Sequence, residues 1–408
     1  MDQITLALAL VGLVVVCLGL VSARVETLPV SKPLLALGAG IAVGPVGLGV
    51  LRPGEWAEGH TILREAARYT LAISVFGIAL RTPPGNYRRL LRPVALLLSV
   101  GMLVMWLVSA GLGWAVLGLS PMSALLVGAV LTPTDPVVSS SIVTGGAATR
   151  SLPDRLRSTL SLEAGTNDGL AYPFVLLPLA FLDPPDGMAP LAHWLLDAVL
   201  RGVGLAVIVG AVIGMLAARA LRVSDDRGWI EEQSLLSMSI ALSLGVLATV
   251  HLIGSDGILA AFAAGATFNL GIATSEEFET EDVQEAISRL FNLPIFVLFG
   301  AVLPWSDWAA LGWAGAGLAL AVLLLRRPLA LAATAPFAGA MVERRDAVFM
   351  GWFGPLGVAA IFYALHAEHR LGDPQAWHVT SLAVALSIAL HGITAAWGMR
   401  RYRTRTPS

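Results

Sequence analysis

Long apolar runs separated by short polar stretches fall at about thirteen places along the chain, each long enough to span roughly 30 Å of hydrocarbon as a helix. Glycine and proline interrupt many runs, which membrane helices tolerate where neighbouring groups satisfy the backbone. The pattern predicts an all-α polytopic membrane protein with one membrane domain over residues 1–408. The predicted spans are 4–22, 33–51, 63–80, 93–114, 122–143, 158–182, 196–218, 234–252, 257–273, 287–304, 309–332, 347–366 and 377–398.

Two of these runs need separate arguments. The third run is the weakest, because Arg64, Glu65 and Arg68 leave a short apolar stretch. The first run ends in Val21-Ser22-Ala23, which resembles a signal-peptide cleavage site. However, no basic residue precedes it, and it exceeds the roughly 7–15 apolar residues of a usual signal peptide. We therefore expect the first run to be retained as a helix.

The composition agrees with a membrane protein. Apolar residues make up 56% of the chain and charged residues only 13%, against about 25% charged residues in soluble domains. The chain has 26 basic and 28 acidic residues, with a net charge of −2, which excludes a basic nucleic-acid-binding protein and a charge-rich disordered one. Cys17 is the single cysteine, so the chain has no intramolecular disulfide, cysteine-pair metal site or redox pair.

The distribution of arginine predicts the orientation. With the N-terminus outside, most basic residues lie on the cytoplasmic side, including those of a basic tail at 399–408, as the positive-inside rule requires. This arrangement favours an odd number of crossings. The acidic stretch from Glu276 to Glu285 is then predicted to be a solvated cytoplasmic loop or surface helix.

The sequence Leu131-Thr132-Pro133-Thr134-Asp135-Pro136 should break the fifth run. Two prolines three residues apart remove two backbone donors and clash with preceding carbonyl groups. A broken helix exposes carbonyl groups such as that of Thr134, and with the Asp135 carboxylate these suit a small cation. In the alternative interpretation, Asp135 caps the half-helix that follows; the two roles are compatible.

A second polar cluster, Glu163-Ala164-Gly165-Thr166-Asn167-Asp168-Gly169, lies in the apolar sixth run. A charged side chain at mid-membrane is costly and marks a candidate functional site. A buried carboxyl group is protonated more readily than one in water, and when ionised its oxygens coordinate a hard cation such as sodium. A carboxylate that binds either a proton or a cation is the minimum machinery for exchange. The alternative is that Asp168 pairs structurally with an arginine.

Arg326-Arg327-Pro328 lies late in the eleventh run. A buried arginine needs a carboxylate partner, and Glu163 is the preferred one. The alternative is an arginine pair that snorkels to water at the cytoplasmic end of its helix.

These motifs together resemble the bacterial sodium/proton antiporters of the first monovalent cation:proton antiporter family, over essentially the whole chain. The stretches 296–300 and 351–360 are also similar to that family. The resemblance rests on Thr134-Asp135-Pro136, Glu163, Asn167-Asp168 and Arg327-Pro328.

The resemblance implies a role for each matching residue and a fold. Asp168 would bind the monovalent cation or the proton, with Thr134 and Asp135 beside the ion at an unwound crossing and Asn167 ordering the site. Glu163 and Arg327 would form a stabilising pair. The fold would have two inverted repeats with two broken crossing helices, a core domain and a dimerisation domain. The fifth and twelfth runs are compatible with inversion, because an odd offset of seven reverses their direction.

Three positions depart from the family pattern. Leu356 stands where many relatives have arginine, Gly77 where some have an acid, and Ala164 where some have serine. The departures concern residues around the ion, whereas the central Asp168 matches the family pattern.

The Asn167-Asp168 pair suggests electroneutral exchange of one monovalent cation for one H⁺. The resemblance implies that this cation is Na⁺, before K⁺ or Li⁺, and that the protein is a homodimer in the bacterial inner membrane that serves pH homeostasis. No enzyme activity, cofactor or nucleic-acid partner is expected. Alternatives are a K⁺/H⁺ antiporter, an ion-coupled symporter of a small organic anion, a cation channel and an intramembrane protease using Asp135 and Asp168. The protease would lack its Gly-x-Gly-Asp signature.

The seven histidines show no metal spacing. Two of them, His251 and His391, are candidates to tune the pH response.

Overall fold

The computed structural model describes residues 3–404, apart from 26–27, 29, 54–55, 57, 140–144, 230–233, 273–279 and 339–342. The regular secondary structure of this part of the chain is helical, with no strand. Of the acidic stretch predicted to be a loop or surface helix, residues 276–279 lie outside the described residues, and residues 280–285 form the first turns of α16 (Thr280–Ala301). Short helices connect the longer ones: α2 (Ser22–Val25), α5 (Pro84–Arg89), α10 (Gly145–Ser151) and α12 (Pro190–Trp194).

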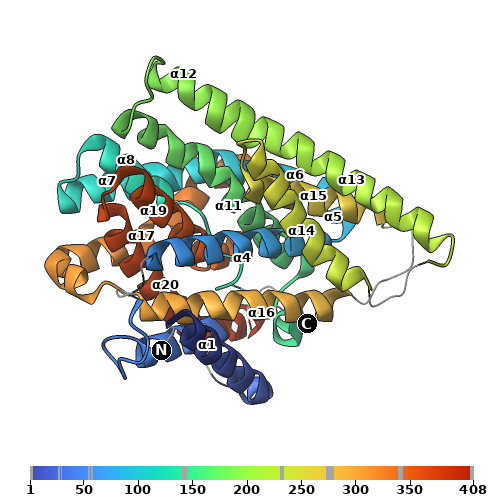
Figure 1. Ribbon diagram of the computed structural model, residues 1–408, viewed down its shortest axis with the longest axis horizontal. Coiled ribbons are helices and arrows are strands. Elements are labelled where there is room, and N and C mark those ends of the chain that lie inside the picture. The colour runs from blue at the N-terminus through green and yellow to red at the C-terminus, as the bar shows by residue number, and fades with distance from the viewer. Residues whose placement is uncertain are drawn as a thin grey trace.

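One set of helices, the flanking group, assembles around α15 (Gly257–Ile272). Helices α4 (Gly59–Arg81), α13 (Ala206–Asp225) and α14 (Ser234–Leu252) pack against α15. Helix α16 (Thr280–Ala301) packs against α3 (Lys32–Val43) and α4, and α1 (Gln3–Leu20) packs against α16. In Figure 1, α13 runs along one edge of the molecule and α1 and α16 lie at the opposite edge.

The other set, the crossing bundle, contains two interrupted helices. The first is α8 (Pro121–Val130), and the second consists of α18 (Arg344–Trp352) and α19 (Val358–Leu371). Around them pack α11 (Asp154–Leu182), α17 (Trp305–Ala338) and α20 (Gln375–Thr404). The set is completed by α6 (Leu91–Leu96), α7 (Met102–Leu117) and the π-helical segment η2 (Leu97–Gly101) between them.

The two sets meet along α11 and α19. Helix α4 packs against both, and α15 packs against α11. A second π-helical segment, η3 (Leu195–Leu205), joins α12 to α13 and also contacts α11. The helix that carries the predicted ion-binding aspartate therefore lies at the boundary between the flanking group and the crossing bundle.

Local sequence explains where the interrupted helices begin and end. Ser120 caps α8 by accepting a hydrogen bond from the Ser123 amide, and Pro121 occupies its first turn, where no amide is needed. Helix α8 ends at Val130 because Pro133 has no amide to continue it. Helix α18 likewise ends just before Gly354-Pro355.

The helices follow the predicted runs with shifted ends. The weakest run is the 23-residue helix α4, in which Arg64, Glu65 and Arg68 lie in the early turns and Arg68 forms an ion pair of 2.5 Å with Glu65. Helix α3 ends at Val43, eight residues before the end of the predicted span 33–51, and α20 continues through part of the predicted tail to Thr404. Within the described residues, four continuous helices have the length and apolar composition needed to cross a membrane: Leu91–Leu117, Pro190–Asp225, Trp305–Phe337 and Gln375–Arg403.

Candidate functional site

The first break follows α8, where residues 131–135 leave the helical conformation. The carboxylate of Asp135 lies at this break and is 1% exposed. Its Oδ1 accepts hydrogen bonds from the amides of Val137 at 2.5 Å and Val138 at 2.9 Å, and its Oδ2 accepts one from the amide of Val358. Asp135 therefore caps the turn that follows it and the N-terminus of α19.

The second break, residues 353–357, lies against the first. The amide of Asp135 donates to the carbonyl of Pro355 at 2.8 Å, so the two extended stretches are joined by backbone as well as by side chain. A Cβ atom on Gly357 would lie 2.0 Å from Asp135 Oδ2. Glycine is thus required at 357 for the two breaks to approach this closely.

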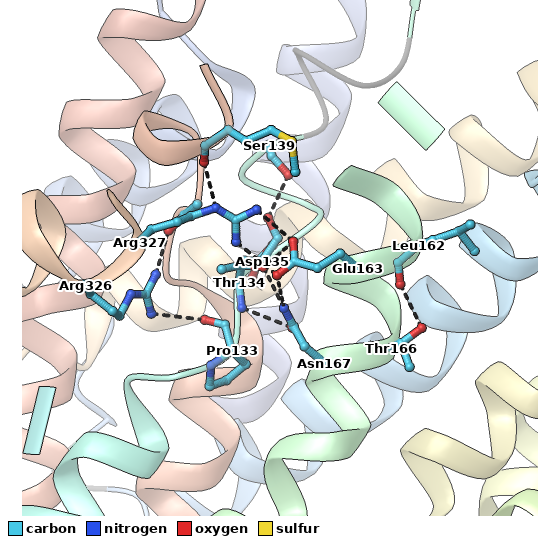
Figure 2. Close-up of polar contacts among 12 residues, drawn as sticks. Pro133, Thr134, Asp135, Ser139, Leu162, Glu163, Thr166, Asn167, Arg326 and Arg327 are labelled. Carbon is cyan, nitrogen blue, oxygen red and sulfur yellow. Dashed lines mark hydrogen bonds and ion pairs between the residues drawn. The ribbon is translucent and has the colours of Figure 1, made fainter. Parts of the chain in front are cut away.

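Arg326 supplies the positive charge at this crossing. Its Nη1 donates to the carbonyl of Leu131, with longer contacts to Thr132 and Pro133 at 3.3 and 3.4 Å, and its Nη2 donates to the carbonyl of Gly354 at 2.6 Å. Figure 2 shows the guanidinium group directed at the first break. Carbonyl groups at a helix C-terminus carry partial negative charge, which a cation compensates.

Arg327, the next residue of α17, forms an ion pair with Glu163 of α11. Its two terminal nitrogens lie 3.0 and 2.8 Å from the two carboxylate oxygens, and its Nε donates to the carbonyl of Met350 at 2.7 Å. Both partners are almost fully buried, and Arg326 is 1% exposed. Neither arginine reaches water at a helix end, so the snorkelling alternative is wrong.

Asn167 joins α11 to the first break. Its side-chain oxygen accepts from the Thr134 amide at 3.1 Å, and its Nδ2 lies 2.8 Å from Thr134 Oγ1 and 3.0 Å from Glu163 Oε1. Figure 2 shows Asn167, Thr134 and Glu163 turned toward one another. The carboxamide and the ion pair thus hold the break against α11.

Asp168 differs from all these groups. It is 0% exposed, and neither of its carboxylate oxygens has a hydrogen-bond partner among the described residues. The negative charges of Asp135 and Glu163 act on it, while Arg327 is engaged by Glu163. The hydroxyl of Tyr363 in α19 donates to the backbone carbonyl of Asp168 at 2.7 Å, not to its side chain.

Two glycines on α11 bring the flanking group close to Asp168. A Cβ on Gly165 would lie 3.0 Å from the Ile78 side chain of α4, and one on Gly169 would lie 2.7 Å from the Leu259 side chain of α15. Apolar side chains therefore close on α11 on either side of Asp168.

Sequence reasoning missed the carbonyl contacts of Arg326 and the hydroxyl of Tyr363. The departures from the family pattern also lie in this region: Leu356 and Gly77 are buried in the second break and in α4, and Ala164 is 4% exposed. His391 is buried beside the second break.

Comparison with known proteins places this geometry in context. A family model described as "Sodium/hydrogen exchanger, transmembrane" matches residues 11–401. A probable Na⁺/H⁺ antiporter of Schizosaccharomyces pombe is 30% identical, over 93% of this chain and 54% of its own length. A Na⁺/H⁺ antiporter of Saccharomyces cerevisiae is 32% identical, over 90% of this chain and 38% of its own. The chain spans about half the length, or less, of these curated relatives.

More distant similarity extends to other antiporters. A K⁺/H⁺ antiporter of Shewanella oneidensis is 26% identical over 92% of this chain and 63% of its own length. The solved structure of the sodium proton antiporter MjNhaP1 from Methanocaldococcus jannaschii superposes with a TM-score of 0.78 at 18% identity, covering 98% of this chain and 99% of that one. The fold of this chain is therefore the fold of that structure.

Proposed function

Because the chain belongs to the sodium/hydrogen exchanger family, we propose that it is an antiporter that exchanges Na⁺ for H⁺ at Asp168. One observation carries this proposal: the two carboxylate oxygens of Asp168 are buried without a hydrogen-bond partner among the described residues. A buried polar group left unpaired is costly and calls for an explanation. A bound proton or a bound cation would each neutralise the buried charge, and the cation would also be coordinated by the carboxylate oxygens.

Competition between the two ions at one carboxylate couples their movements. The ionised group binds a hard monovalent cation through oxygen, and the protonated group cannot. Thr134 and Asp135 lie on the neighbouring break and are the next candidates to contact the cation, while Asn167 fixes Thr134 in place. We propose that Glu163 and Arg327 act as a stabilising pair and leave Asp168 free to exchange its ligand.

We further propose that exchange is electroneutral, with one cation moved for each proton. Asn167 stands beside Asp168 in place of a second carboxylate, so either ligand leaves the site with the same charge. A site whose loaded states carry equal charge is not driven by the membrane potential. Access alternates between the two sides, and a minor conformational difference is sufficient for this.

Sodium is the preferred cation because the relatives of at least 30% identity reported above are named Na⁺/H⁺ antiporters. Potassium is the second candidate, since a more distant relative is named a K⁺/H⁺ antiporter. A homodimer, an N-terminus outside and a cytoplasmic C-terminus remain proposals. The bacterial inner membrane also remains a prediction, because the relatives that support sodium are fungal.

The test uses the full chain in proteoliposomes that contain a pH-sensitive dye. An imposed gradient of Na⁺, K⁺ or Li⁺ should move protons in the wild type, and Asp168→Asn should abolish this movement while the chain stays folded. Asp307→Asn, which changes a half-exposed carboxylate at the start of α17, is the control and should exchange normally. Intact exchange in Asp168→Asn would refute the proposed site. A rate that follows an imposed potential at clamped pH would refute electroneutrality.

A further inference from the structure

The second break leaves polar backbone groups without helical partners at both of its ends. At its start, the only described backbone group that donates to the carbonyl of Trp352 is the nearby amide of Gly354, at 3.1 Å. Near its end, Leu356 lies after the last residue of α18 and before the first residue of α19, so its amide belongs to neither helix. Since buried backbone groups are nearly always paired, the partners of these two groups determine how the break is held.

Both partners come from one face of α20. Ser387 Oγ accepts the Leu356 amide at 2.8 Å, and His391 Nε2 lies 2.9 Å from the Trp352 carbonyl oxygen. Ser387 and His391 are four residues apart, 0% and 4% exposed, and in contact with each other. Thr394, one turn further, accepts the indole N–H of Trp352 at 2.9 Å.

The proton on His391 Nε2 follows from its partner. A carbonyl oxygen only accepts, so Nε2 must donate to it. The other ring nitrogen, Nδ1, lies 3.1 Å from Ser387 Oγ and 2.9 Å from the Ser387 carbonyl. A neutral ring accepts the hydroxyl proton there, and a charged ring donates to the carbonyl. The bond from Nε2 to Trp352 exists in both cases.

We propose that Ser387 and His391 are positioning residues that hold the second break in register with the first. With its two ends fixed, the Val358 amide stays on the Asp135 carboxylate, and the N-terminus of α19 stays at the crossing. Helix α19 also carries Tyr363, whose hydroxyl bonds to the Asp168 backbone. The proposal rests on the exchange proposed at Asp168, because it assigns Ser387 and His391 to the machinery of that site.

The arrangement parallels the way the first break is held. There, Asn167 of α11 binds the Thr134 amide. Ser387 of α20 accepts a hydrogen bond from the Leu356 amide in the same manner, and His391 donates one to the Trp352 carbonyl at the other end of the second break. Each break is thus held by hydrogen bonds from its backbone to side chains of a neighbouring continuous helix.

The test compares matched variants of buried serines on α20. Ser387→Ala removes the acceptor for Leu356, whereas Ser381→Ala alters an equally buried serine that accepts from the Trp308 side chain of α17. Hydrogen exchange of the peptide covering residues 352–358 should become about tenfold faster or more in Ser387→Ala, as expected when a buried amide loses its acceptor. The exchange rate of this peptide should be unchanged in Ser381→Ala. In both variants, the exchange rate of the peptide covering residues 131–138 should change by less than that of the 352–358 peptide changes in Ser387→Ala.

Transport supplies the second measurement. Ser387→Ala and His391→Leu should raise the Na⁺ concentration for half-maximal exchange by about tenfold, with a smaller effect on the maximal rate, since a displaced α19 weakens the site. His391→Gln should restore much of the affinity, because its amide can still donate to the Trp352 carbonyl. Wild-type affinity and protection in Ser387→Ala, or the same changes in Ser381→Ala, would overturn the proposal. A wild type that exchanges no cation would refute the proposed function instead, and hydrogen exchange would still decide whether Ser387 and His391 hold the break.

Discussion

The ion pair between Glu163 and Arg327 allows a quantitative test of the electrostatics of the crossing. Glu163 is 1% exposed and Arg327 3%, and their side chains are joined by two hydrogen bonds of 3.0 and 2.8 Å. Replacing only Glu163 by leucine leaves a guanidinium charge in an apolar interior, at a cost of about 3–5 kcal/mol. Replacing only Arg327 by methionine should cost a similar amount. The double variant removes both charges and should cost much less than the sum.

The assay is chemical unfolding of the purified chain in detergent, for the wild type, both single variants and the double variant. A coupling free energy of at least about 2 kcal/mol is expected from such a cycle. As a matched control, the exposed pair of Arg370 and Asp183, joined at 2.8 Å, should show a coupling of less than about 1 kcal/mol. Additive effects at Glu163 and Arg327 would refute the reasoning, because they would mean that neither charge depends on the other.

Three further outcomes are expected. Changes in stability are measured by unfolding in detergent, and changes in exchange are measured by transport in proteoliposomes. Arg326→Lys should destabilise the chain by about 2–3 kcal/mol and slow exchange, because an ammonium group cannot span the carbonyl groups of both breaks. Gly357→Ala should abolish exchange, since its Cβ would lie 2.0 Å from Asp135 Oδ2, whereas Gly111→Ala, with no atom within 4 Å, should not. Asp256 caps α15, and burial raises its pKa to about 7. The wild type therefore loses stability as the pH rises toward 7. The free energy of unfolding of Asp256→Asn, relative to that of the wild type, should increase by about 3 kcal/mol between pH 5 and pH 8.

Much of the architecture was predictable because its signals are local. Membrane helices are set by long apolar runs, and a break by prolines that lack an amide, so the interruption after α8 was visible in Pro133 and Pro136. The cost of a charge in an apolar run singled out Asp168 in the same way. Capping by Asp135, one of the two roles considered for it, is also a local interaction within the break.

The side-chain pair of Glu163 and Arg327 was predicted across the bundle, but the partners of Arg326 could not be, because they are backbone groups. The carbonyls of Leu131 and Gly354 bind Arg326, but any residue could supply a carbonyl, so no residue type marks this contact. The contacts of Ser387 and His391 could not be predicted for the same reason, since both bind the backbone at the second break. The sequence therefore indicated which charged groups are unusual in a membrane and paired Glu163 with Arg327, whereas the backbone partners of these groups are evident only in the fold.

The charges around the crossing bear directly on stoichiometry. Asp135 accepts hydrogen bonds from amides at the start of two helical segments, and Arg326 donates to carbonyl groups at the ends of two others. Glu163 forms an ion pair with Arg327. Each of these carboxylates has a cationic or amide partner that does not depend on the transported ion. Asp168 is the exception among the described residues of the crossing, because its oxygens lack a partner. If exchange occurs there, a proton and a monovalent cation neutralise the same single charge, and a second charge would move only if one of the other pairs opened during the cycle.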